Sequence, residues 1–86
     1  MEEKKNKSIK SLNELKNGEK GTIVSFNDKG NNELKRHLLG MGFVKGSEIT
    51  FEKTAPLGDP IKLKLKGYSI CIRKNEAENI KVQLVI

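Results

Sequence analysis

The chain has 86 residues, which is enough for one small domain, and no apolar run in it is long enough to span a bilayer. Its 17 basic and 11 acidic side chains give a formal net charge of +6, which suits nucleic acid, anionic lipid or an acidic protein as a partner but also serves solubility alone. The single cysteine, Cys71, excludes an internal disulfide framework and indicates a reducing compartment, so we expect a cytoplasmic protein.

Residues 1–10 are predicted to form a disordered basic tail, because they hold four lysines and no apolar stretch of the kind that a secretory signal needs. The folded domain is expected to span residues 11–86. It begins with Ser11 and Glu14 at the spacing of a capping box, which indicates at most a short helical segment before the first strand.

Residues 21–26 are rich in β-branched and aromatic side chains and predict the first strand. Turn-forming residues follow it. Leu34, Leu38 and Met41 then recur at helical spacing, so we expect a helix with one apolar stripe toward the core. Two glycines at the end of this stripe are expected to terminate the helix.

The rest of the chain alternates apolar and polar side chains in short runs, which predicts strands with one dry and one wet face. About one helical turn is expected before the last strand. About five short strands, with a helix between the first two, predict a mainly β fold, either a small barrel or a half-open sandwich, whose own side chains fill the interior. The strands predicted after the helix span residues 48–54, 61–66, 68–73 and 80–84.

Residues 55–60, Ala-Pro-Leu-Gly-Asp-Pro, are predicted to form a stiff, sharply bent connection between two strands. Each proline fixes its own φ and holds the preceding residue extended, while Gly58 is free to take a positive φ that a side chain resists. Such a connection holds Leu57 and Asp59 in fixed positions, and a fixed loop loses little ordering entropy when it binds a partner. The same turn chemistry also suits a hairpin connection with no further role.

Residues that carry metal or acid–base chemistry are sparse in this chain. His37 is the only histidine and Cys71 the only cysteine, so no pair of soft ligands stands at metal-binding spacing. No phosphate-cradling loop and no acid–base motif is visible, and we therefore expect neither an enzyme nor a bound cofactor. His37 is expected at the surface of the helix, and Cys71 is expected to be a buried, inert thiol.

The lysines at alternate positions of residues 62–66 form a cationic row. Together with Phe43, Phe51 and Tyr68 as possible stacking platforms, this row is typical of small barrels that bind nucleic acid. Lysines on the wet face of a strand also protect sheet edges against aggregation, and we favour this second interpretation.

Several segments spread along the chain match the pattern of one protein family. The matching residues are Ser11, Leu12, Leu15 and Gly18; residues 38–43 and Gly46; residues 55–61; Gly67; residues 72–74, Glu76 and Ala77; and Ile80 and Val82. Over about residues 11–84, these segments resemble the ferrous iron transport protein A family (FeoA), and the block at residues 55–60 is the most specific match. Lys45 and His37 depart from the pattern, since the family commonly has a proline and a basic residue there.

The resemblance implies an SH3-like barrel and a small cytoplasmic accessory or regulatory protein of bacterial ferrous iron uptake. The partner that it implies is a large ferrous iron permease with its own GTP-binding domain, which would hold the protein at the inner face of the membrane. A similar barrel forms the C-terminal domain of iron-dependent repressors. The alternative is therefore a metal-associated or nucleic-acid-binding module, although nucleic acid is the less favoured partner.

The candidate site is a protein-binding surface around the tip of the proline-bracketed loop. In this interpretation Leu57 fills an apolar pocket of the partner, and Asp59 accepts hydrogen bonds or pairs with a cation. Two residues from the end of the predicted helix are expected to lie beside the loop. No catalytic residue and no metal ligand is predicted. The candidate partner-binding residues are Leu57, Gly58, Asp59, Pro60, Gly42 and Phe43.

Overall fold

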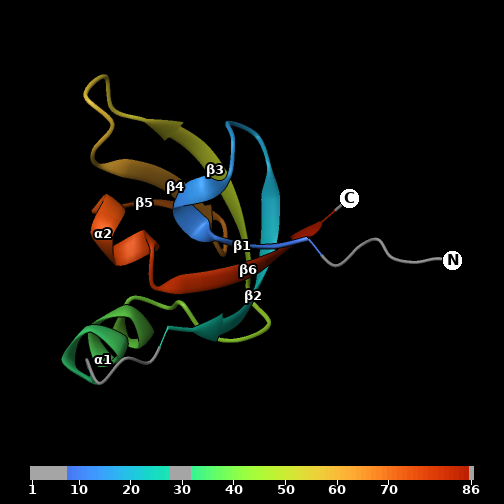
Figure 1. The fold of residues 1–86 in the computed structure, drawn as a ribbon, viewed down its shortest axis with the longest axis vertical. Coiled ribbons are helices and arrows are strands. Elements are labelled where there is room, and N and C mark those ends of the chain that lie inside the picture. Colours follow the sequence, from blue (N-terminus) through green and yellow to red (C-terminus); the bar gives the residue numbers. More distant parts are fainter. Residues whose placement is uncertain (1–7, 28–31, 86) are drawn as a thin grey trace, which may run out of the picture.

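Six antiparallel strands form one curved sheet in the computed structural model, which describes residues 8–27 and 32–85 (Figure 1). The order across the sheet is β1-β6-β2-β3-β4-β5. Register shifts between Ile23 and Ser25 and between Phe51 and Lys53 bend the paired strands, as bulges do, and the sheet closes toward an SH3-like barrel. The strands are β1 (Ile9–Ser11), β2 (Lys20–Phe26), β3 (Glu48–Thr54), β4 (Ile61–Leu65), β5 (Tyr68–Ile72) and β6 (Ile80–Val85).

Three short helices connect these strands: the 3-10 helix η2 (Leu12–Glu14), α1 (Asn32–Gly40) and α2 (Lys74–Ala77). The expected short segment at the start of the domain is η2, where Glu14 Oε1 accepts a hydrogen bond of 2.9 Å from the Ser11 backbone N–H. The expected helical turn before the last strand is α2. Figure 1 places α1 at one end of the barrel and the loop between β3 and β4 at the opposite end.

Strand β1 corrects the predicted boundary of the tail. The basic composition predicts disorder through Lys10, but Ile9 lies opposite Gln83 of β6 and Lys10 opposite Val82. The prediction is wrong for these two residues, because backbone pairing with β6 orders a segment whose side chains carry no strand pattern. It also makes the number of strands among the described residues six instead of about five. Residues 1–7 of the predicted tail lie outside the described residues.

Apolar side chains fill the interior, as the alternation within the strands predicts. In β4, Ile61, Leu63 and Leu65 are buried, while Lys62 and Lys64 between them reach the surface. None of the described polar or charged residues is buried. Each buried leucine or isoleucine stabilises the fold by about 1.5–3 kcal/mol, so this continuous core is the main source of stability. The buried apolar residues are Leu12, Leu15, Ile23, Leu38, Phe43, Ile49, Phe51, Ile61, Leu63, Leu65, Ile72, Ala77, Ile80 and Val82.

The apolar stripe of α1 is confirmed. Leu38 is fully buried, and Leu34 and Met41 pack against the core from partly exposed positions. The backbone N–H of Phe43 donates to Leu38 O at 3.1 Å, which holds the segment after the helix against its last turn. This closure directs the Phe43 side chain into the core.

Strands β2 and β6 approach closely at Gly21. A methyl group on Gly21 would place its carbon 2.9 Å from Val82 Cβ, which is closer than side-chain carbons pack. At Gly40, the last residue of α1, an added methyl group would meet no atom within 4 Å beyond its chain neighbours and the backbone of its own helix. The two glycines therefore differ in whether the fold needs the missing side chain.

We expect Gly21→Ala to lower the free energy of unfolding by about 1–3 kcal/mol, because Val82 and its strand must shift to admit the methyl group. Gly40→Ala is the matched control. It should leave stability unchanged or raise it by up to about 1 kcal/mol, since alanine is the better helix former. Urea denaturation of both variants measures the difference, and equal stabilities would contradict the close approach of β2 and β6.

Candidate functional site

The loop of residues 55–60, which joins β3 to β4, folds back on itself through two backbone hydrogen bonds. Gly58 N–H donates to Ala55 O at 2.7 Å, and Ala55 N–H donates to Pro60 O at 3.0 Å. The φ of Gly58 is +94°, in the left-handed region that side chains rarely adopt. The predicted bent connection is confirmed, and Gly58 adopts the positive φ that the sequence left open to it.

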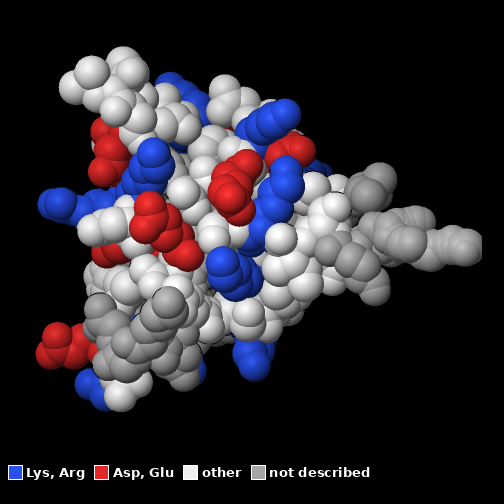
Figure 2. Space-filling model, in the orientation of Figure 1, with Lys and Arg blue, Asp and Glu red and all other residues white. Residues whose placement is uncertain are grey.

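Leu57 stands at the tip of the 55–60 loop and is 96% exposed, more than any other large apolar side chain among the described residues. The tip of the loop forms the uncharged protrusion at the upper left of Figure 2. A side chain in this position adds nothing to the packing of its own chain. Its apolar surface is therefore free for another molecule.

Asp59 is exposed, but its carboxylate already has a partner inside the chain. Asp59 Oδ1 accepts a hydrogen bond of 2.9 Å from the backbone N–H of Lys74, the first residue of α2. An aspartate at the start of a helix satisfies an N–H group that has no partner within the helix. Asp59 thus ties the 55–60 loop to α2, a role that the sequence interpretation did not assign to it.

Helix α2 is in turn linked to α1 through Glu76. Glu76 Oε1 accepts a hydrogen bond of 2.8 Å from the Arg73 backbone N–H. The other carboxylate oxygen, Oε2, lies 3.4 Å from His37 Nε2 on α1. His37 is 56% exposed, as expected for a surface histidine. Two carboxylates therefore hold the start of α2, one from the 55–60 loop and one from α2 itself.

An open hollow of about 310 Å³ lies beside the 55–60 loop and is lined by Asp59, Pro60 and Arg73. Arg73 joins the site because β4 pairs with β5: Ile61 lies opposite Ile72, so their outer neighbours Pro60 and Arg73 meet. Sequence reasoning did not assign Arg73 to this site. The sequence does contain a feature that predicts this contact: a tight turn after β4 fixes the register of the β4–β5 hairpin, and this register brings Pro60 and Arg73 together.

Gly42 and Phe43 do not lie beside the 55–60 loop, and this part of the prediction is wrong. Gly42 lies against Tyr68 and Leu65, at the end of β4 farthest from the loop. Tyr68 Oη donates a hydrogen bond of 3.0 Å to Met41 O, which fixes the two segments together there. Phe43 has no exposed surface at all, so it serves the core and cannot contact a partner.

The lysine row and the three aromatic side chains that suggest nucleic-acid binding do not form one exposed surface. Phe43 and Phe51 are both buried, which removes them as stacking platforms, and only Tyr68 of the three aromatic residues is exposed. Lys62 is half-buried and Lys64 is exposed on the outer face of β4. Figure 2 shows positive side chains interspersed with negative ones on the visible face, without a single basic patch.

Cys71 is exposed, which contradicts the expected buried thiol. Its strand, β5, lies at the edge of the sheet, and Cys71 pairs with Lys62 on the outer face of β4. The alternation places Cys71 on the polar face of β5 with Ser69 and Arg73, opposite the buried Ile72, and this alternation outweighs the general tendency of cysteine to be buried.

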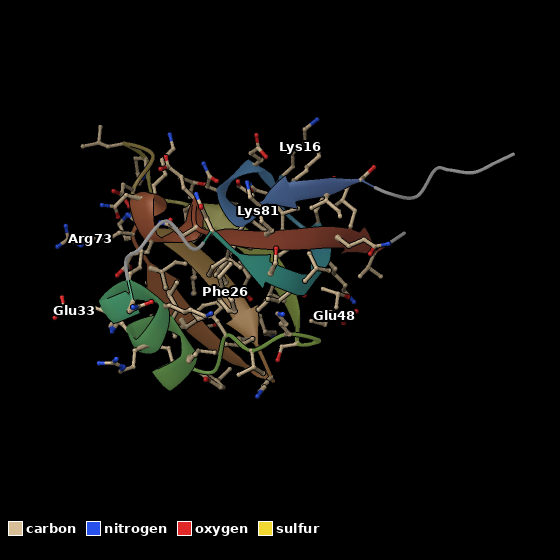
Figure 3. The ribbon with its side chains drawn as sticks, turned by 60° about the horizontal axis from the view of Figure 1, so that its bottom comes forward. Lys16, Phe26, Glu33, Glu48, Arg73 and Lys81 are labelled. Carbon is tan, nitrogen blue, oxygen red and sulfur yellow. The ribbon has the colours of Figure 1, made fainter. Side chains whose placement is uncertain are left out.

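Other sites for small ligands are not evident in the described part of the chain. Residues 8–27 and 32–85 contain no group of three or more His, Cys, Asp or Glu side chains that could hold a metal ion. A crevice lined by residues including Phe26, Leu34 and Leu38, between α1 and the end of β2, has no room for a water molecule (Figure 3). No helix in the described ranges is long and apolar enough to cross a membrane.

Three solved structures share this fold. The NMR structure of a FeoA-like protein from Clostridium acetobutylicum is 37% identical, with a TM-score of 0.82 over 91% of this chain and 88% of that one. The FeoA of Stenotrophomonas maltophilia, described as an SH3 domain protein and crystallised with zinc, is 28% identical, with a TM-score of 0.72 over 84% of this chain and 87% of that one. A manganese-dependent transcriptional repressor, only 16% identical, shares the fold alone, with a TM-score of 0.80 over 90% of this chain and 42% of that one.

Sequence relatives identify the family. An Fe(2+) transport protein A/Fe(2+) transporter FeoB fusion protein of Porphyromonas gingivalis is 35% identical over 86% of this chain, which spans only 8% of that long protein. A putative Fe(2+) transport protein A of Campylobacter jejuni is 35% identical over 87% of this chain and 99% of its own length. The family model of the FeoA domain matches residues 10–84. The chain therefore belongs to the FeoA family of ferrous iron transport proteins.

Proposed function

We propose that this protein is an accessory regulator of ferrous iron uptake that docks on the cytosolic part of a ferrous iron permease carrying a GTP-binding domain. The observation that carries the proposal is the relative in which a segment similar to this chain is joined to an Fe(2+) transporter FeoB. Covalent fusion keeps two domains at high effective concentration, which favours partners that contact each other. On this proposal the protein acts in the cytoplasm, at the inner face of the membrane.

The 55–60 loop has the physical properties of a docking element. Two backbone hydrogen bonds close it, and Asp59 fastens it to α2, so binding need not order it. Gly58 leaves the tip narrow, and Pro60 lines the hollow beside it. Leu57 would then enter an apolar pocket of the permease. Burial of this side chain alone would contribute about 1.5–3 kcal/mol to the complex.

The protein would perform no reaction of its own. A small barrel whose interior is filled by its own side chains offers its surface for contacts, and the hollow beside the 55–60 loop is open at the rim. Its effect on iron uptake would then come from binding the permease in one conformation more tightly than in another.

Leu57→Ala should weaken binding to the purified cytosolic domain of the permease by about 10- to 100-fold, because the buried apolar contact is lost. The free energy of unfolding should change by less than about 0.5 kcal/mol, since the side chain touches nothing in its own chain. Isothermal titration calorimetry measures the first quantity and urea denaturation the second.

Ile9→Ala is the matched control for this experiment. Ile9 is also an exposed apolar residue, at 54%, but it lies on β1, far from the 55–60 loop in Figure 1. Its truncation should leave the affinity unchanged. If Leu57→Ala binds as tightly as the unmodified protein, the loop has no part in docking.

The hydrogen bond from Lys74 to Asp59 predicts how Asp59 contributes to stability. Asp59→Ala should lower the free energy of unfolding by about 0.5–2 kcal/mol, the usual cost of removing the side chain that caps a helix. Asp59→Asn should retain most of the stability, because the amide oxygen can still accept the hydrogen bond from Lys74. Urea denaturation compares the two variants. Equal loss in both would mean that charge, and not the hydrogen bond, fastens the loop.

A further inference from the structure

Arg73 presents a positive charge that no side chain in the described part of the protein pairs with. The backbone N–H of Arg73 is bound by Glu76, but the guanidinium has no hydrogen bond or ion pair within residues 8–27 and 32–85. The side chain is exposed and, in Figure 3, points away from the sheet. An arginine held at its backbone with a free planar head is suited to binding a carboxylate through two parallel hydrogen bonds.

The charge around the hollow favours an anion. Asp59 is the one acidic residue that lines it, and Asp59 Oδ1 is engaged by the Lys74 N–H. The side chains of Arg73 and Lys74 are both exposed at this end of the molecule. Arg73 is the one positive side chain that lines the hollow, and its guanidinium has no partner among the described residues. The lining carboxylate of Asp59 already accepts a hydrogen bond, so an entering anion finds a free partner in Arg73.

We infer that the hollow receives an acidic side chain of the protein partner, which pairs with Arg73 while Leu57 enters an apolar pocket next to that side chain. The inference rests on the proposed function and names the chemistry of the surface that recognises this chain: a carboxylate beside an apolar depression. Asp59 is then a positioning residue, because it fixes the loop and α2 relative to each other, and its own negative charge offers the partner's carboxylate no attraction.

The size and shape of the hollow agree with this occupant. Its volume of about 310 Å³ lies at the low end of the range for small-molecule pockets, roughly 300–1,000 Å³, and only three described residues line it. It is too open to enclose a ligand but has room for one side chain with its water. Arginine is also one of the residue types enriched among the few residues that dominate protein interfaces.

Binding of three full-length variants to the cytosolic domain of the permease tests the inference. Arg73→Glu should weaken binding by at least about tenfold, because the acidic side chain then faces a like charge. Asp59→Asn, which keeps the hydrogen bond to Lys74, should bind within about threefold of the unmodified protein or more tightly. Lys16→Glu makes the same charge change at an exposed site well away from Arg73 in Figure 3 and should change the affinity less than threefold at physiological salt.

The outcomes separate this inference from the proposal on which it rests. If the unmodified protein does not bind the domain, both are overturned. If it binds and Arg73→Glu binds equally well, only the inference is overturned. A loss of tenfold or more in Asp59→Asn would mean that the partner brings a cation to Asp59, and an equal loss in Lys16→Glu would mean general charge attraction. Either result also overturns the inference. Circular dichroism of each variant confirms that it is folded.

Discussion

The hydrogen bond of 2.9 Å from the Lys74 backbone N–H to Asp59 Oδ1 joins the two parts of the molecule that form the candidate site. Without it, the 55–60 loop would be held only at its two ends, by β3 and β4, and α2 would lose a partner for its first N–H group. With it, Leu57, Pro60 and Arg73 have fixed relative positions. The same bond therefore serves the stability of α2 and the preorganisation of the proposed docking surface.

The filled core decides where function can lie in a chain of this size. Every strand from β2 to β6 contributes apolar side chains to one interior, and none of the described polar or charged residues is buried there. The chemistry available to a partner is consequently confined to the rim and to the outer faces of the strands. At the rim, the connection between β3 and β4 combines a fully exposed apolar side chain, a closed backbone and an adjacent hollow.

Most of the fold follows from local sequence patterns. Wrong predictions occur mainly where side-chain position or strand pairing depends on residues distant in sequence. Alternation predicts the strands because one face of each must be buried, and the helical stripe around Leu38 predicts α1 for the same reason. Strand β1 has no such pattern. It is held in the sheet by pairing with β6, which is distant in sequence, so no local pattern predicts it. The position of Phe43 was predicted wrongly because the direction of a side chain just after a helix depends on the closure of the barrel. The burial of Cys71 was predicted wrongly because the usual burial of cysteine was preferred to the alternation, which places Cys71 on the polar face of β5.

The candidate site, too, is partly predictable from local sequence and partly a result of the fold. Turn chemistry alone predicts the bend at residues 55–60 and permits a positive φ at Gly58, but it does not say which side chains of the loop remain free. The structure separates them: Asp59 is engaged with α2 and Leu57 is not engaged at all. Because Arg73 arrives from the next strand through the register of the β4–β5 hairpin, the surface is a product of sheet pairing. A block of sequence can thus be specific to a family for two reasons at once, with one residue required for the shape of the loop and its neighbour left free for recognition.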